Sequence, residues 1–131
     1  MSSGPYTQAQ ILLIKASEDE SALQAIGNPD AVLGFHAQQA VEKLMKALIS
    51  ARLAPFELTH NLLRLATALQ NLGEVLPVTP VSLSELSDFA VEYRYDLLFQ
   101  HATPSITDLI ETVRVIREHV VARITVLSGT P

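Results

Sequence analysis

The chain has 131 residues, of which 48% are hydrophobic and 18% are charged. This length predicts a single domain over residues 1–131, and this composition excludes an intrinsically disordered chain. The absence of cysteine excludes a disulfide scaffold and thiolate metal sites, and the net charge of −5 disfavours a duplex binder held by bulk positive charge. No stretch has the character of a targeting or membrane-spanning segment, so we expect a cytoplasmic protein with no membrane partner.

Glycine and proline clusters divide the chain into five segments with helical periodicity. The first segment, about residues 7–26, has apolar residues close to helical spacing and a polar middle at Ser17–Ser21. The second segment, residues 30–51, begins at Asp30, a favourable N-cap residue, and carries an apolar stripe at steps of three and four. Both segments are therefore predicted to be helices.

The third predicted helix covers about residues 59–72, with a threonine N-cap at its start and Gly73 as the residue that ends it. The fourth, about residues 82–100, opens with a Ser-x-x-Glu capping box, and the fifth covers residues 105–127. No strand-like alternation competes with these patterns. We therefore expect an all-α fold, an up-and-down bundle of four to five antiparallel helices.

The second segment carries His36, Gln39, Lys43 and Lys46 at steps of three, four and three, which places them on one face of a helix. One interpretation is a solvated face that contains a Glu42–Lys46 ion pair four residues apart. The other is a polar face that lines a groove or a subunit interface, where glutamine and lysine side chains hold a phosphate. We place Gln39 and Lys43 in an accessible groove together with Arg94.

His60 stands near the start of the third segment, where it either orders the loop or belongs to a binding site. The four histidines of the chain show no HExxH pattern and no close pairing, so the sequence predicts no metal site and no cofactor.

Arg94 and His101 are separated by six residues within the densest polar and aromatic part of the sequence. A guanidinium binds phosphate in a bidentate manner, and a histidine transfers a proton near neutral pH. The pair has the chemistry for metal-independent RNA cleavage, in which His101 deprotonates the ribose 2′-OH. The alternative is a structural network in which Arg94 pairs with Asp88 or Glu92.

Four pieces of the sequence together resemble the HEPN domain family (higher eukaryotes and prokaryotes nucleotide-binding). They are the run HAQQAVEKL from His36 to Leu44, the following Lys-Ala-Leu, Thr59-His60-x-Leu, and the Tyr-Arg-Tyr that ends at Tyr95. The resemblance extends over about residues 7–127. It implies a small helical bundle that is usually dimeric, so we expect a homodimer.

The resemblance also implies a function, and three remain open. Small members of the family partner a minimal nucleotidyltransferase in pairs of the toxin–antitoxin type, and we rank such a nucleotide-binding or interaction module first. A metal-independent ribonuclease toxin that uses Arg94 and His101 is the second. A structural helical dimer without catalysis is the third. The expected ligand or interface residues are His36, Gln39, Lys43, Lys46, His60 and Tyr95, with nucleotide or RNA as the expected ligand.

Overall fold

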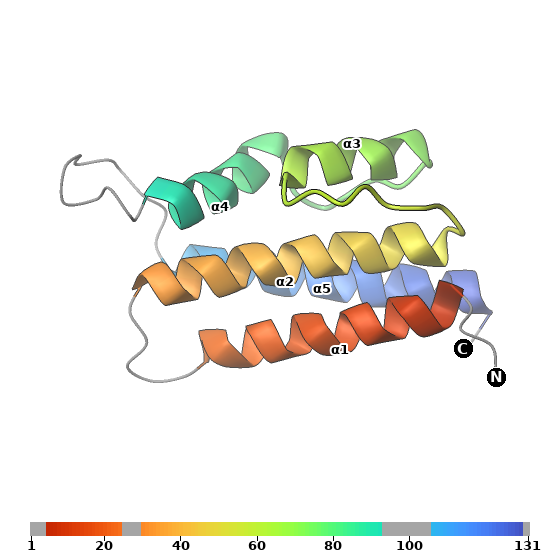
Figure 1. Ribbon diagram of the computed structural model, residues 1–131, viewed down its shortest axis with the longest axis horizontal. Helices are drawn as coiled ribbons and strands as arrows, with labels where there is room; N and C mark the ends of the chain where they lie inside the picture. The colour runs from red at the N-terminus through yellow and green to blue at the C-terminus, as the bar shows by residue number, and fades with distance from the viewer. Residues whose placement is uncertain (1–4, 25–29, 93–105, 130–131) are drawn as a thin grey trace.

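The computed structural model describes residues 5–24, 30–92 and 106–129 (Figure 1). Within these ranges the chain forms α1 (Pro5–Leu23), α2 (Asp30–Ala51), α3 (Leu62–Asn71), α4 (Pro80–Glu92) and α5 (Ile106–Ser128). No strand is present in the described ranges. The predicted all-α bundle is confirmed.

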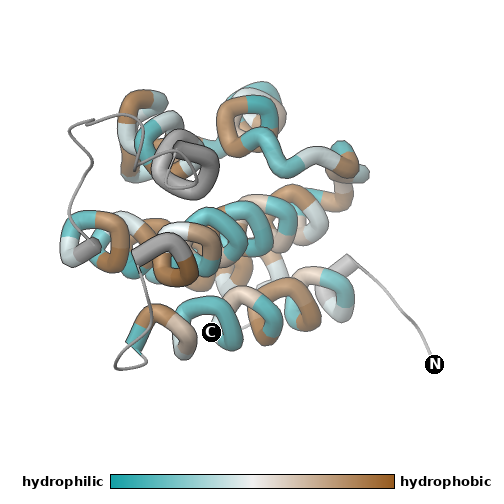
Figure 2. The backbone as a smooth tube through the Cα atoms, turned by 60° about the vertical axis from the view of Figure 1, so that its left-hand side comes forward, coloured by the Kyte–Doolittle hydropathy of each residue, from teal (hydrophilic) through white to brown (hydrophobic). Residues whose placement is uncertain are grey.

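Helix α2 is the centre of the bundle, because it contacts each of the other four helices. In Figure 1, α1 runs along one side of α2, α3 and α4 follow one another along the opposite side, and α5 lies behind. Almost every side chain from Ala40 to Ala51 is buried, with Lys43 as the exception. Figure 2 shows apolar and polar positions alternating along the helices, as expected for helices that bury one side.

Small residues lie on the buried sides of α1 and α2. Ala9 and Ala16 of α1 and Ala37 and Ala40 of α2 have no exposed surface. Because the distance between packed helices depends on the side chains at the contact, alanines allow the two helices to approach closely. A charged side chain between α1 and α2 is therefore shielded from water by both helices.

The predicted ends of the first, second and fifth helices agree with the structure to different degrees. Helix α2 has the predicted bounds, and α5 differs from its prediction by one residue at each end. Helix α1 begins at Pro5 and ends at Leu23, earlier than predicted at both ends. Proline fits a first helical turn because its missing N–H would have had no intrahelical partner.

Two predicted helix starts are wrong because neighbouring residues supply the caps. The side chain of Asn61, and not of Thr59, accepts the Arg64 N–H at 3.2 Å, so α3 is shorter than predicted. Helix α4 starts at Pro80, where Thr79 Oγ1 accepts the Ser82 N–H at 3.2 Å in place of the predicted capping box. The predicted end of this helix, near residue 100, lies outside the described residues.

The predicted stop at Gly73 is confirmed, and it positions a charged side chain. Gly73 has φ +88°, a conformation that side-chain-bearing residues rarely adopt. The Gly73 N–H donates to Gln70 O at 3.0 Å and the Glu74 N–H donates to Leu69 O at 3.0 Å, which together form a Schellman motif. This turn directs the chain so that Glu74 is buried.

Candidate functional site

The polar residues of α2 share one side of the helix as predicted, but neighbouring segments cover much of that side. His36 and Lys43 contact α1, whereas Glu42 and Lys46 contact the segment that precedes α3. The predicted Glu42–Lys46 ion pair is present at 3.0 Å, with side chains only 5% and 10% exposed. The interpretation of this pair as part of a solvated face is therefore wrong.

Asp19 of α1 joins two of the predicted residues, and we call these three side chains the Asp19 cluster. One carboxylate oxygen contacts His36 Nδ1 at 2.8 Å and the other accepts from Lys43 Nζ at 2.5 Å. Because an ionised carboxylate only accepts hydrogen bonds, His36 Nδ1 carries the hydrogen. Sequence reasoning did not single out Asp19. Its signal was a carboxylate three residues after Ala16 and four before Leu23, on the buried side of α1.

Glu42 is the centre of a second group, the Glu42 cluster, which consists of Glu42, Lys46 and His60. Its Oε2 accepts from Lys46 Nζ at 3.0 Å and its Oε1 contacts His60 Nδ1 at 2.8 Å. Lys46 Nζ also lies 5.4 Å from the centre of the Phe56 ring, a cation–π geometry that shields the ammonium. The carboxylate and the ammonium balance each other, so the cluster is neutral when His60 is neutral.

A hydrogen bond also holds the backbone of His60 in place. Gln38 Nε2 donates to His60 O at 3.0 Å, and Gln39 Nε2 donates to Gln38 Oε1 at 2.9 Å. The next residue, Asn61, caps α3. The His60 ring is nevertheless 81% exposed. A fixed backbone and a fixed Nδ1 therefore present the rest of the ring to solvent.

Helix α2 keeps one accessible side, which we call the α2 strip. Its residues follow one another at steps of three, one, three and four, and they are Val32, Phe35, His36, Gln39 and Lys43. Phe35 is half exposed, and its ring lies edge-on to the His36 ring at 5.4 Å between centroids. An exposed aromatic residue among partly exposed polar residues is typical of a protein-interaction surface.

The predicted residues Arg94, Tyr95 and His101 lie outside the described residues. The catalytic pair, and the groove expected to join Lys43 and Gln39 with Arg94, therefore stay predictions.

A third carboxylate, Glu74, connects α5 to the end of α3. Its two oxygens accept from Arg123 at 2.9 and 3.0 Å, and Arg52 Nη1 lies 3.4 Å from Oε2. The hydrogen bonds from Arg123 are the largest cause that lowers the pKa of Glu74, and the charges of Arg123, Arg52 and His119 add to them against the opposing effect of burial. Glu74 therefore favours its charged form in the folded chain.

This lowered pKa predicts a stability that depends on pH. A carboxyl group with a lowered pKa in the folded state stabilises the fold above its ordinary value of 4.5, and this stabilisation is lost as the pH falls through the folded value. We expect the free energy of unfolding of the wild type to fall with acidification more steeply than that of Glu74→Gln. Urea unfolding, in steps from neutral pH to below 4.5, measures the difference.

Glu111→Gln is the matched control for this experiment. The pKa of Glu111 is also lowered, by hydrogen bonds from Arg114, but its side chain is 57% exposed and solvent screens the pair. The fall of its unfolding free energy with acidification, its acid slope, should stay close to that of the wild type. Parallel acid slopes for the wild type and Glu74→Gln would contradict the assignment.

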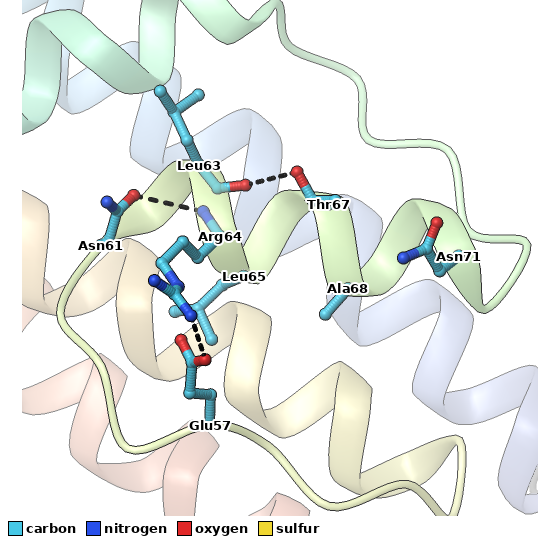
Figure 3. A pocket seen from close by; sticks show the side chains of 8 residues that line it. All are labelled: Glu57, Asn61, Leu63, Arg64, Leu65, Thr67, Ala68 and Asn71. Carbon is cyan, nitrogen blue, oxygen red and sulfur yellow. Dashed lines mark hydrogen bonds and ion pairs between the residues drawn. The ribbon is translucent and has the colours of Figure 1, made fainter.

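Two pockets formed by the described residues are large enough to be considered for ligands. Figure 3 shows a pocket on α3, where Arg64 pairs with Glu57 and Asn61 caps the helix. The volume of this pocket is about 390 Å³. A second pocket, of about 530 Å³, lies between α1 and α5, where Arg117 pairs with Glu20 at 3.0 Å. Burial raises the pKa of Glu20 despite the opposing effect of Arg117. In both pockets an arginine already has a carboxylate partner.

Almost all lysine and arginine side chains that the structure describes are paired with a carboxylate in this way. Eight of the nine lysines and arginines lie in the described ranges, and seven of them form ion pairs with carboxylates of the same chain. Lys15, on the exposed side of α1, is the remaining one. The described surface therefore offers little uncompensated positive charge to a polyanion.

Neither a group of side chains that could hold a metal ion nor a membrane-spanning helix is found in the part of the chain that the structure describes. No group of three or more histidine, aspartate or glutamate side chains has an arrangement that could hold a metal ion there. No described helix is long and apolar enough to cross a membrane.

Comparison with protein families supplies a match over most of the chain. The profile of the HEPN domain family matches residues 11–124. The matched range begins within α1 and ends within α5, so it includes all residues of the Asp19 and Glu42 clusters. Comparison with curated proteins and with solved structures finds no significant match.

Proposed function

Because the chain belongs to the HEPN domain family, we propose that it is an interaction module that partners a minimal nucleotidyltransferase in a pair of the toxin–antitoxin type. The family in general supports a nucleotide-binding or ribonuclease-like module. The specific partner is our proposal, as is the predicted homodimer.

The observation that carries this proposal is the internal pairing of the described cations. Proteins that bind RNA or DNA gain most of their affinity from lysine and arginine contacts to phosphates. Here seven of the eight described cations contact carboxylates of the same chain. Each would have to exchange a carboxylate for a phosphate, and a net charge of −5 opposes that exchange. A protein partner requires no such exchange.

The α2 strip is the surface that we assign to this partner. Phe35 supplies apolar contact area, whereas His36, Gln39 and Lys43 supply polar groups around it. The Asp19 cluster fixes His36 and Lys43 before a partner arrives, which reduces the entropy that binding costs.

Coexpression tests the proposal. The tagged chain is produced with the minimal nucleotidyltransferase that the proposal expects beside its gene, and the mass of the purified species is measured by size-exclusion chromatography with light scattering. We expect a stable complex, and the mass of the chain alone reports whether it forms a homodimer. Phe35→Ala should weaken the complex about tenfold or more, as expected for an aromatic hot spot.

Leu58→Ala is the control, because Leu58 is 93% exposed and lies outside the α2 strip. It should bind like the wild type. The absence of a complex, or of a nucleotidyltransferase gene beside this one, would contradict the proposal, as would equal loss in both variants.

The second candidate is the metal-independent ribonuclease, which the spacing of Arg94 and His101 favours. In that mechanism the guanidinium stabilises the charge that develops on phosphate and the imidazole transfers the proton. The Arg94→Lys variant should not cleave RNA, because an ammonium group cannot form the two parallel hydrogen bonds that a guanidinium forms with phosphate.

A further inference from the structure

The geometry of the Glu42 cluster points to His60 Nε2 as a nucleophile that accepts a phosphoryl group from a small phosphoryl donor. This modification site goes beyond partner binding and does not depend on it. The inference rests on three features of His60. Its tautomer is fixed, its ring is exposed, and the Glu42 carboxylate at its Nδ1 is paired with Lys46.

The tautomer follows from the contact with Glu42. The carboxylate accepts from His60 Nδ1 at 2.8 Å, so Nδ1 carries the hydrogen and Nε2 of the neutral ring carries the lone pair. The side chain of Glu42 is only 5% exposed, so water competes weakly for this hydrogen bond. This is the arrangement in which a carboxylate orients a histidine for attack or proton transfer.

Exposure distinguishes His60 from the other histidines that the structure describes. The His60 side chain is 81% exposed, whereas that of His36 is 28% exposed and lies against Phe35. Nε2 of His119 is buried without a hydrogen-bond partner. Of these three rings, His60 therefore presents its nitrogen to an incoming donor with the least obstruction.

The charge balance of the cluster also favours the reaction. Lys46 Nζ holds the second oxygen of Glu42 at 3.0 Å, so the carboxylate already has a cationic partner within the cluster. When Nε2 bonds to phosphorus, positive charge develops on the ring, and the carboxylate beside Nδ1 stabilises it. The Gln38 contact to the backbone keeps the loop in place during the attack.

The step is balanced with phosphoramidate as the donor. The Nε2 lone pair forms the N–P bond while the bond from phosphorus to the protonated amino nitrogen breaks. Ammonia leaves with that electron pair, and Nδ1 keeps its hydrogen bond to Glu42. No oxidant, reductant or metal takes part.

The test is phosphorylation by potassium phosphoramidate, followed by ³¹P NMR and by peptide mass spectrometry under conditions that preserve the N–P bond. We expect His60 to be labelled at Nε2 at least about tenfold faster than His36, since exposure and tautomer both favour it. His60→Asn keeps a donor near Glu42 but removes Nε2, and it should lose this label. His36→Asn should keep it.

If His60 were labelled only because its ring is exposed, the rate of labelling would not depend on the Glu42 carboxylate. Glu42→Gln should slow labelling of His60 about tenfold or more, because the tautomer is no longer fixed. Circular dichroism checks the fold of this variant. If it does not fold, Glu42→Asp, which shortens the side chain and retains the charge, should show the same slowing. Labelling of His60 no faster than of His36, or unaffected by the Glu42 variant that folds, would overturn the proposal.

Discussion

Replacing Glu42 by alanine is expected to lower the free energy of unfolding by about 3 kcal/mol, the loss typical of a buried ion pair deprived of one partner. The reason is Lys46, whose side chain is 10% exposed and which would keep a buried ammonium without its carboxylate. His60 would lose its Nδ1 acceptor as well. Urea unfolding at neutral pH measures the change.

Two controls separate this effect from the general loss of a glutamate. Glu57→Ala removes a carboxylate from an exposed pair with Arg64 and should change stability little. The double variant Glu42→Ala/Lys46→Met removes both buried charges and should recover much of the loss. A loss for Glu42→Ala no greater than for Glu57→Ala would show that the cluster does not stabilise the fold.

Leu48→Ala is the second substitution with a large expected effect. Leu48 has no exposed surface and belongs to α2, the helix that contacts all the others. The variant should lose about 3 kcal/mol of unfolding free energy, from the lost transfer of the side chain and from the cavity that remains. Urea or thermal unfolding provides the measurement.

Leu58→Ala makes the same chemical change at a residue that is 93% exposed, so no cavity forms and stability should stay nearly unchanged. Similar losses for the two leucines would contradict the assignment of α2 as the centre of the core.

The fold was predictable because the helical periodicity of each segment is strong. The bounds of α2 follow from an N-terminal breaker and a long apolar stripe, and the end of α3 follows from Gly73. Helix starts were less predictable where several cap residues compete. Thr59 and Asn61 both have suitable side chains, and only the three-dimensional path of the loop decides that Asn61 caps α3.

The candidate site was predictable only in part, since helical spacing shows which residues share a side and not which segments cover it. His36, Lys43 and Lys46 share a side of α2, but Asp19 comes from α1 and His60 from the segment before α3. These contacts join residues 17 to 24 positions apart in sequence, and no local pattern encodes them. For that reason, the sequence pattern did not reveal that Lys46 is buried.

One measurement tests most directly the central claim that the chain acts through protein contact and not by cleaving RNA. Purified wild-type chain is incubated with total RNA in the presence of a metal chelator, beside Arg94→Ala and His101→Ala. The paired cations predict that the RNA stays intact with all three proteins. Cleavage by the wild type that both substitutions abolish, with the fold intact by circular dichroism, would contradict the claim and establish the ribonuclease instead.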